Sequence, residues 1–352
     1  GPDLLDALAL GAKPEIPKGR KITLVDYRML KLGGDVDDAA LIAQASPALL
    51  TVLATAADGN DAMRLAAAEA AAGANALKSA DLAATYRSGA PQVSAGDDLG
   101  LLDTLSNDLA PRRAALFKSI ELERTPQKKT RQIRGFLDSA RRTGFYWPAL
   151  QLMAEPARTL NPAPEIGWFA ETAIEVALAA GDFERAREWA NSGVQATTPS
   201  GGDLRHWLAL ADIADAKQAG AKGANLDSVE QLALTGRFDP VLLHRLATVL
   251  DALDTHIPVP LWEAASRSPQ PATGHLPATG VLVELQDAAR RKDLPRTVSL
   301  VFQSLGPRGA EGVHIIALGD VMRALRRSGM EREARAIAVE ALFALWPRST
   351  SS

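Results

Sequence analysis

The chain has 352 residues, which suffices for two or three ordinary domains or for one extended array of repeated elements. It contains no cysteine, which excludes disulfides, thiolate metal sites and cysteine nucleophiles. Its net charge of −3 is too small to indicate a polyanionic partner, and its hydrophobic content of 47% is dominated by Ala and Leu, which favours close helix-on-helix packing.

Residues 1–20 are predicted to be a peripheral lead-in to the fold. The chain begins Gly1-Pro2, which resembles the scar of a specific protease, and we expect upstream residues to have been trimmed. A signal peptide, a membrane anchor or a neighbouring domain would each account for the trimming. No apolar run reaches the ~18–20 residues of a membrane span, so we expect a soluble chain without a transmembrane segment.

Residues 21–96 are predicted to form an N-terminal helical region. The pair Ser46-Pro47 is a typical helix start, with Ser as the N-cap and Pro at the first helical position, and Asn60 is a second N-cap. Residues 21–26 are the one segment for which a strand is an alternative. The predicted helices are 23–32, 36–45, 46–57, 60–73 and 79–88, and the loop 89–96 ends the region.

Residues 97–265 are predicted to form a central helical-hairpin region, 266–279 a linker and 280–352 a set of C-terminal hairpins. The linker is rich in Ser, Pro, Gly and Thr, and residues 161–164 form a shorter Pro-rich break. The predicted helices are 97–108, 111–124, 126–143, 148–160, 165–180, 183–194, 203–219, 227–235, 240–254, 259–266, 280–291, 295–305, 311–328 and 331–346.

Four short stretches share one pattern: a turn residue, then a large apolar residue, then Ala or Val three or four positions later. They begin at Gly181, Gly236, Lys292 and Ser328. Each lies between two segments of helical period, which predicts the tight turn of a helical hairpin. Recurring hairpins predict an all-α fold, an α-solenoid or superhelix of antiparallel helical hairpins.

The first of these turns resembles the turn of tetratricopeptide repeats. In that family a Gly closes one helix, an aromatic residue opens the next, and a small residue three positions later seats the two helices together, as Gly181, Phe183 and Ala186 do in sequence. The other stretches depart from the pattern, and only the last interval, 36 residues, is close to the ~34 of the family. The resemblance implies a degenerate tetratricopeptide-like helical repeat over about residues 165–346, with the Phe183 ring buried between helices.

One basic zone interrupts a mildly acidic chain. Residues 111–150 carry 10 basic and 3 acidic side chains, and within the predicted helix 126–143 the cations follow one stripe and apolar residues another. This pattern indicates a face that binds an acidic protein or an anionic lipid surface, or else a solvated face beside an acidic neighbour. Nucleic acid is the weakest partner, because the whole chain is acidic. The candidate partner-binding cations are Lys128, Lys129, Arg131, Arg134, Arg141 and Arg142.

Aromatic residues are concentrated in the middle of the chain. Eight of the 17 fall within 63 positions, from Phe145 to Trp207. In a solenoid such side chains line a concave groove and anchor a peptide or a sugar, or they form the core of the hairpins. The candidate anchors are Tyr146, Trp147, Trp168, Trp189 and Trp207.

Motifs of catalysis, cofactor binding and metal binding do not stand out in the sequence. The five histidines are not paired at i+3 or i+4, no Ser lies in a nucleophile elbow, and no Gly-rich loop has the context of a phosphate cradle. Asp35, Asp37 and Asp38 loosely resemble a calcium loop, but its twelfth position is Ser46. We therefore expect a protein that is not an enzyme and that uses no cofactor or metal.

Two hypotheses of function follow. The first is a non-catalytic scaffold for protein–protein interaction in a bacterial cell envelope, where a periplasmic location is favoured over a cytoplasmic one by the missing Cys and the trimmed N-terminus. The second is a helical region or accessory of a peptidoglycan-acting enzyme that binds glycan strands. Some lytic transglycosylases carry an α-superhelical region, and the resemblance to them is one of architecture alone.

Overall fold

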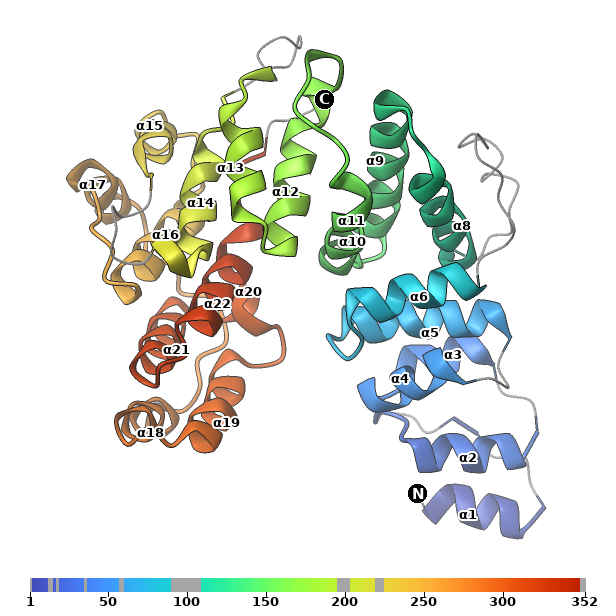
Figure 1. Ribbon diagram of the computed structural model, residues 1–352. Helices are drawn as coiled ribbons and strands as arrows, with labels where there is room; N and C mark the ends of the chain where they lie inside the picture. Colours follow the sequence, from blue (N-terminus) through green and yellow to red (C-terminus); the bar gives the residue numbers. More distant parts are fainter. Residues whose placement is uncertain are drawn as a thin grey trace. The chain divides into compact units, whose positions relative to one another are not determined.

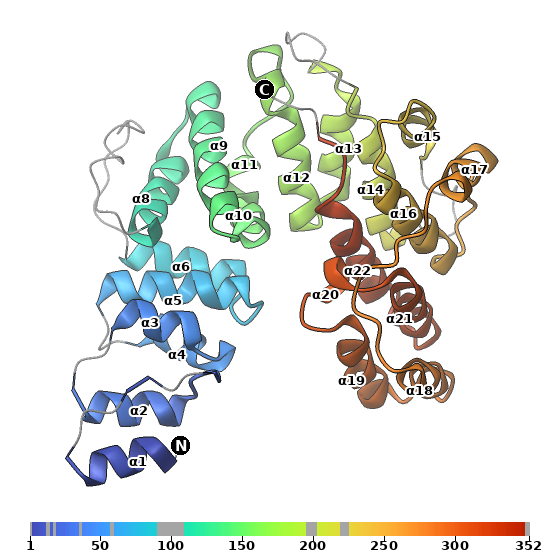
Figure 2. The same ribbon diagram turned by 180° about the vertical axis from the view of Figure 1, so that it is seen from behind.

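The computed structural model describes residues 2–11, 15–16, 19–34, 37–56, 60–89, 109–194, 203–218 and 225–348. Every regular element in these ranges is helical, so the predicted all-α fold is confirmed. The chain divides into two compact units, unit 1 (Gly1–Asn161) and unit 2 (Pro162–Ser352), whose helices are labelled in Figures 1 and 2. The division falls at the predicted break 161–164. Among the described helices, none combines the length and the apolarity that a membrane span requires.

Unit 1 begins with short helices whose starts match the predicted caps. The Ser46 hydroxyl accepts the N–H of Leu49, and the Asn60 side chain accepts the N–H of Met63 at 2.6 Å. The predicted helix 97–108 lies outside the described residues. The helices of unit 1 are α1 (Pro2–Ala9), α2 (Leu24–Leu32), α3 (Asp38–Gln44), α4 (Pro47–Thr55), α5 (Asp61–Gly73), α6 (Ser79–Gly89), α8 (Leu109–Leu122), α9 (Pro126–Arg142), α10 (Tyr146–Leu152) and α11 (Ala154–Ala157).

The strand alternative for residues 21–26 is wrong. Ile22 makes a single bridge to Ala45, and the helix α2 starts two residues later. The cap of α2 explains why the chain turns helical there: the Asp26 carboxylate accepts the N–H of Thr23 at 3.0 Å and binds Arg20 through both oxygens, at 2.6 and 2.8 Å. This pairing with Arg20 holds the pKa of Asp26 well below its usual range.

The core of unit 1 forms where α5 packs against α4, α6 and α8, and where α8 packs against α9. Tyr86 of α6 meets Phe117 of α8 and Phe136 of α9 edge to face, with ring centroids 5.6 and 6.4 Å apart. Because Ala fills much of α5, the neighbouring helices approach closely, as the composition predicts. This core fixes the position of α9.

Unit 2 contains three of the four hairpins predicted from the turn pattern, and one break that the sequence did not predict. Residues 311–328 form two helices instead of one, because His275 makes a β-bridge with Val313 and takes up the backbone groups that a continuous helix would use. The predicted linker 266–279 thus lies inside unit 2. The helices are η1 (Pro164–Phe169), α12 (Ala170–Ala180), α13 (Phe183–Asn191), α14 (His206–Ala214), η3 (Ala216–Gln218), α15 (Asp227–Leu234), α16 (Pro240–Ala252), α17 (Val259–Arg267), α18 (Thr279–Arg290), α19 (Leu294–Leu305), α20 (Gly309–Gly312), α21 (Ile315–Arg327) and α22 (Glu331–Phe343).

The four predicted turns share one backbone geometry. In each, one residue is left-handed: Gly181 (φ 73°), Gly236 (φ 68°), Lys292 (φ 56°) and Gly329 (φ 85°). The N–H of the following residue then donates to the carbonyl five positions earlier, at 2.9 to 3.0 Å. This is the Schellman motif, which ends a helix and redirects the chain. A tight turn is therefore confirmed at all four positions.

Three of these turns join helices that pack on each other, namely α12 with α13, α18 with α19, and α21 with α22. The turn at Gly236 differs, since α15 packs against α14 and α17 instead of pairing with α16.

The prediction that the Phe183 ring is buried is wrong: the ring is half-buried, whereas Ala186 and Trp189 are buried. Phe183 is the first residue of α13, and side chains tilt toward the helix N-terminus, so its ring lies beside the exposed turn.

Replacing Gly181 with Ala is expected to destabilise unit 2 by about 1–2 kcal/mol, the usual cost of a left-handed L-residue. A Cβ at this position would meet no atom within 4 Å, so the whole effect comes from the backbone. Gly280 is the matched control, because it lies within α18 in equally open space without a positive φ. Urea denaturation of both variants measures the difference. Equal effects at the two positions would contradict the turn assignment.

Candidate interaction surfaces

The exposed side of α9 carries a row of cations. Ile133 and Phe136 face the core of unit 1, whereas Arg131 and Arg142 are exposed on the opposite side. Eleven residues separate these two arginines, which is close to three helical turns, so they lie about 16 Å apart along one line. Neither has a hydrogen-bond or ion-pair partner in the described part of the chain. We call Arg131, Arg142 and the flanking Lys128, Arg134 and Arg141 the α9 basic face.

The flanking cations of the α9 basic face are partly engaged. Lys128 lies 3.7 Å from Glu123, and Arg134 lies 3.3 Å from Asp138 one turn further along α9. The Arg141 guanidinium stacks over the Tyr146 ring, 4.2 Å from its centroid. Glu123 and Asp138 thus approach two of the five cations, whereas Arg131 and Arg142 stay exposed.

Lys129 does not belong to the α9 basic face. Its side chain is buried, and its ammonium lies 3.3 Å from the Thr159 hydroxyl. Burial lowers the pKa of Lys129. The sequence placed it with the other cations because it adjoins Lys128, but adjacent residues on a helix point about 100° apart.

The five aromatic candidates do not form one exposed row. Trp189 and Trp207 are buried within unit 2, so no partner contacts them in this conformation. Tyr146 and Trp147 are half-buried in α10, and Trp168 of η1 is exposed. Trp207 packs against Phe343 and Trp346, and Phe238 completes this cluster. For Trp189 and Trp207 the alternative interpretation, hairpin core, is therefore the one that fits.

A buried ion pair holds α9 in place within unit 1. The Glu69 carboxylate of α5 accepts the Tyr86 hydroxyl at 2.5 Å and the Arg113 Nε–H at 2.8 Å. Arg113, on α8, also donates to the Ser139 hydroxyl of α9 at 3.3 Å. Burial raises the pKa of Tyr86, so the phenol remains a proton donor. Three helices, α5, α6 and α8, thus meet at one carboxylate that is satisfied on both oxygens, and Arg113 connects them to α9.

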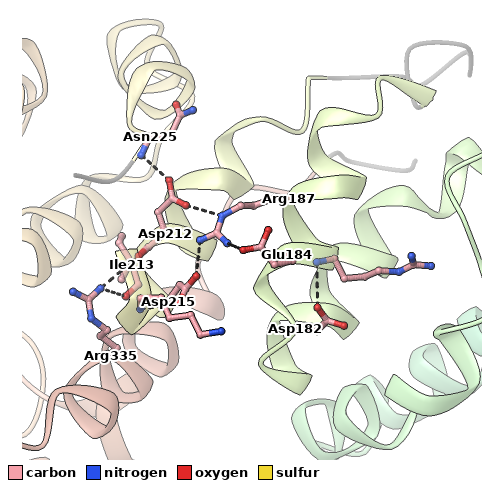
Figure 3. Close-up of polar contacts among 10 residues, drawn as sticks. Asp182, Glu184, Arg187, Asp212, Ile213, Asp215, Asn225 and Arg335 are labelled. Carbon is pink, nitrogen blue, oxygen red and sulfur yellow. Dashed lines mark hydrogen bonds and ion pairs between the residues drawn. The ribbon is translucent and has the colours of Figure 1, made fainter. Parts of the chain in front are cut away.

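A second polar cluster joins three helices of unit 2 (Figure 3). Arg187 of α13 donates to Asp212 at 2.9 Å and to Asp215 at 3.1 Å, both at the C-terminal end of α14. From the other side, Arg335 of α22 donates to the Ile213 carbonyl at 2.7 Å. Cations at a helix C-terminus complement its dipole and its unpaired carbonyls. Arg187 thus binds both carboxylates and Arg335 binds the backbone, so the cluster ties α13 and α22 to the end of α14.

An open hollow of about 510 Å³ lies between the starts of α14 and α15, with His206 in its wall. The imidazole is buried, with Nδ1 3.1 Å from the Asp203 carbonyl and Nε2 2.9 Å from the Pro347 carbonyl. Burial lowers the pKa of His206. A neutral imidazole carries one N–H and donates to one of these two carbonyls, and the contact with Pro347 joins the chain after α22 to the start of α14.

The acidic residues that resemble a calcium loop act as caps where they are described. The Asp37 carboxylate accepts the N–H groups of Ala39 and Ala40 at the start of α3, and Asp38 accepts the Asn60 amide at 3.2 Å. Asp35 lies outside the described residues. Within the described ranges, no group of three or more His, Asp or Glu side chains is placed to hold a metal ion.

No protein-family model, no curated protein and no solved structure shows a significant match to this chain.

Sequence reasoning did not find the residues that hold these surfaces in position. Glu69 and Arg113 are 44 residues apart, and Arg335 lies 122 residues from Ile213, so no local pattern pairs them. One signal was present: Glu69 is the single charged residue in an Ala-rich stretch of seven residues, and a lone charge on an apolar helix indicates a buried partner.

Proposed function

We propose that this protein is a non-catalytic scaffold for protein–protein interaction, built from tetratricopeptide-like helical hairpins stacked as a solenoid. The observation that carries the proposal is the α9 basic face, in which Arg131 and Arg142 are exposed and lack partners in the described residues. Such a face on a rigid helix suits an acidic segment of another protein, because charge complementarity accelerates association and selects the partner.

The recurring turns support the solenoid part of the proposal. The turns at Gly181, Lys292 and Gly329 share one geometry: each has one residue with a positive φ, followed by an N–H that donates to the carbonyl five positions earlier. Each of these turns lies between two helices that pack on each other. Repetition of one hairpin geometry is typical of repeat proteins, whose elongated surfaces bind other macromolecules. The tetratricopeptide-like character rests on Gly181 and Ala186, since Gly181 ends α12 and Ala186 is buried in α13, which packs on α12.

The test is capture of a partner from extracts of the source organism by the full chain. The variant Arg131→Glu/Arg142→Glu is expected to weaken capture about tenfold or more, because two exposed attractive charges become repulsive. Helicity is expected to stay unchanged, since neither side chain has a partner to lose in the described residues. Lys129 is kept out of the variant because it is buried.

The matched control is Arg237→Glu/Arg332→Glu, which makes the same change of net charge at two exposed arginines of unit 2. Neither has a partner among the described residues. Equal loss of capture by the two double variants would mean that overall charge, and not the α9 basic face, governs binding. Undiminished capture by the α9 variant would rule out this face.

Binding of glycan strands has less support. That hypothesis depends on an aromatic groove, and two of its five residues, Trp189 and Trp207, lie in the core of unit 2. Co-sedimentation with peptidoglycan tests it directly. A location in a bacterial cell envelope, periplasmic in preference to cytoplasmic, stays part of our proposal and is supported by the absence of Cys. Fractionation of the native host checks it.

A further inference from the structure

The helix α19 exposes an apolar row that no described residue of unit 2 covers. With α18 it forms one end of unit 2, and it contacts α18, α20 and α21 (Figures 1 and 2). Leu300, Val301 and Leu305 fill its buried side. The row lies beside them at i, i+4 and i+8, and its members are Leu294, Val298 and Phe302, which are 46%, 37% and 71% exposed.

The apolar surface of α19 is therefore wider than the part of it that the neighbouring helices cover. The end of a helical stack is normally polar, because an apolar end recruits another element. Residues at i, i+4 and i+8 span about 12 Å along the helix, the length of about two turns of a partner helix. Phe302 stands out furthest and has the character of an anchor residue.

The charges at one end of the row decide which partner it fits. Arg290, Arg291 and Lys292 form the turn just before Leu294, and Asp287 is shared between the two arginines. Lys292 has no partner in the described residues.

Other acids nearby do not remove this surplus of positive charge. Glu284 is paired with Arg296, and the Asp293 carboxylate caps the start of α19. At the far end of the row Arg308 and Glu311 balance each other in sign. Positive charge therefore remains concentrated at the turn.

A second copy of the chain fits this pattern poorly. Two α19 helices packed antiparallel through Val298 would bring the basic turn of each copy toward Arg308 and Glu311 of the other, whose charges balance. A parallel pair would bring the two basic turns together. Neither arrangement offers the basic turn a net attraction, and the parallel one places cations beside cations, which costs binding energy. An acidic helix from a different protein can pack on the same row, and its carboxylates are attracted to the basic turn before Leu294.

We propose that Leu294, Val298 and Phe302 form a docking site for an amphipathic helix of a partner protein, with apolar residues on one face and acidic residues at the end beside Lys292. The site lies on unit 2 and the α9 basic face on unit 1, so it gives the proposed scaffold a second contact that uses other residues and does not depend on the first.

The test uses a synthetic helical peptide of about 18 residues, with Leu at i, i+4 and i+8 and Glu at the flanking positions, and a matched peptide with Lys in place of Glu. Fluorescence anisotropy with the full chain is expected to show at least tenfold tighter binding of the Glu peptide. Phe302→Ser is expected to weaken it at least tenfold, and Lys292→Glu about threefold. Val259→Ser, at an exposed apolar position of α17, is expected to leave binding unchanged.

Several results would overturn the docking site. These are no binding of the Glu peptide, equal binding of the Lys peptide, or full binding by the Phe302 variant. A dimer in sedimentation equilibrium that Phe302→Ser dissociates would show that a second copy covers the row. The Arg131→Glu/Arg142→Glu variant is expected to bind the peptide normally. If this variant bound the peptide more weakly, peptide binding would depend on the overall charge of the chain and not on the α19 row. If partner capture failed while peptide binding was normal, only the proposed scaffold function would be contradicted.

Discussion

Replacing Glu69 with Ala is expected to lower the free energy of unfolding of unit 1 by about 3–5 kcal/mol, because the change leaves the buried Arg113 guanidinium without a counter-charge. The Tyr86 hydroxyl loses its acceptor in the same step. Backbone hydrogen exchange measured on the full chain is the appropriate readout, since it reports α5 and α8 separately from unit 2. Protection in α5 and α8 is expected to fall by at least a hundredfold.

The matched control for Glu69 is Glu121→Ala. Glu121 pairs with Arg87 at 2.6 Å, but the pair is exposed, so its loss is expected to cost less than about 1 kcal/mol. The double variant Glu69→Leu/Arg113→Met is expected to recover most of the stability, because it removes both charges together. If the single Glu69 variant were as stable as the Glu121 variant, the buried pair would not hold the helices of unit 1 together.

Replacing Trp207 with Ala is expected to cost unit 2 about 3–5 kcal/mol, the range for a buried Trp. The indole packs against Phe343 and Trp346, residues that lie near the far end of the chain, and donates to Glu171 at 3.3 Å. The cavity would therefore separate α14 from α22. Chemical denaturation followed by circular dichroism measures the loss.

Trp262 provides the comparison for this substitution, because it is exposed on α17. Its replacement by Ala is expected to change the free energy of unfolding by less than about 1 kcal/mol. The pair also separates the two interpretations of the aromatic residues. If Trp207→Ala removed partner binding and left the free energy of unfolding unchanged, Trp207 would be a binding anchor, and its assignment to the core of unit 2 would be contradicted.

The sequence was most informative where structure is local. Ser46 followed by Pro47 specifies a helix start within four residues, and a residue tolerant of positive φ specifies the turn at Gly181 within six. The same Schellman bond also closes turns at Asn75 and Asp254, which were not predicted as such because Asn and Asp serve equally as caps. Helix type and many boundaries follow from this local chemistry.

The sequence was least informative where residues distant along the chain meet. The bridge between His275 and Val313 splits a predicted helix, and nothing near Val313 in the sequence announces it. Lys129 was assigned to the exposed cations, but it is buried. The spacing of charged residues in a sequence indicates a helix, but it does not show which side of that helix other helices cover. The uncovered row on α19 was missed for the same reason, since apolar residues at helical spacing are normally core.

The central claim is that the α9 basic face binds an acidic partner, and a charge-swap measurement tests it most directly. Once a partner is captured, its affinity for the wild-type chain and for Arg131→Glu/Arg142→Glu is measured by titration, with the partner's contacting acids present or replaced by Lys. We predict that either change alone weakens binding about tenfold or more and that the two together restore most of it. A double exchange that binds no better than the single ones would contradict direct contact at this face.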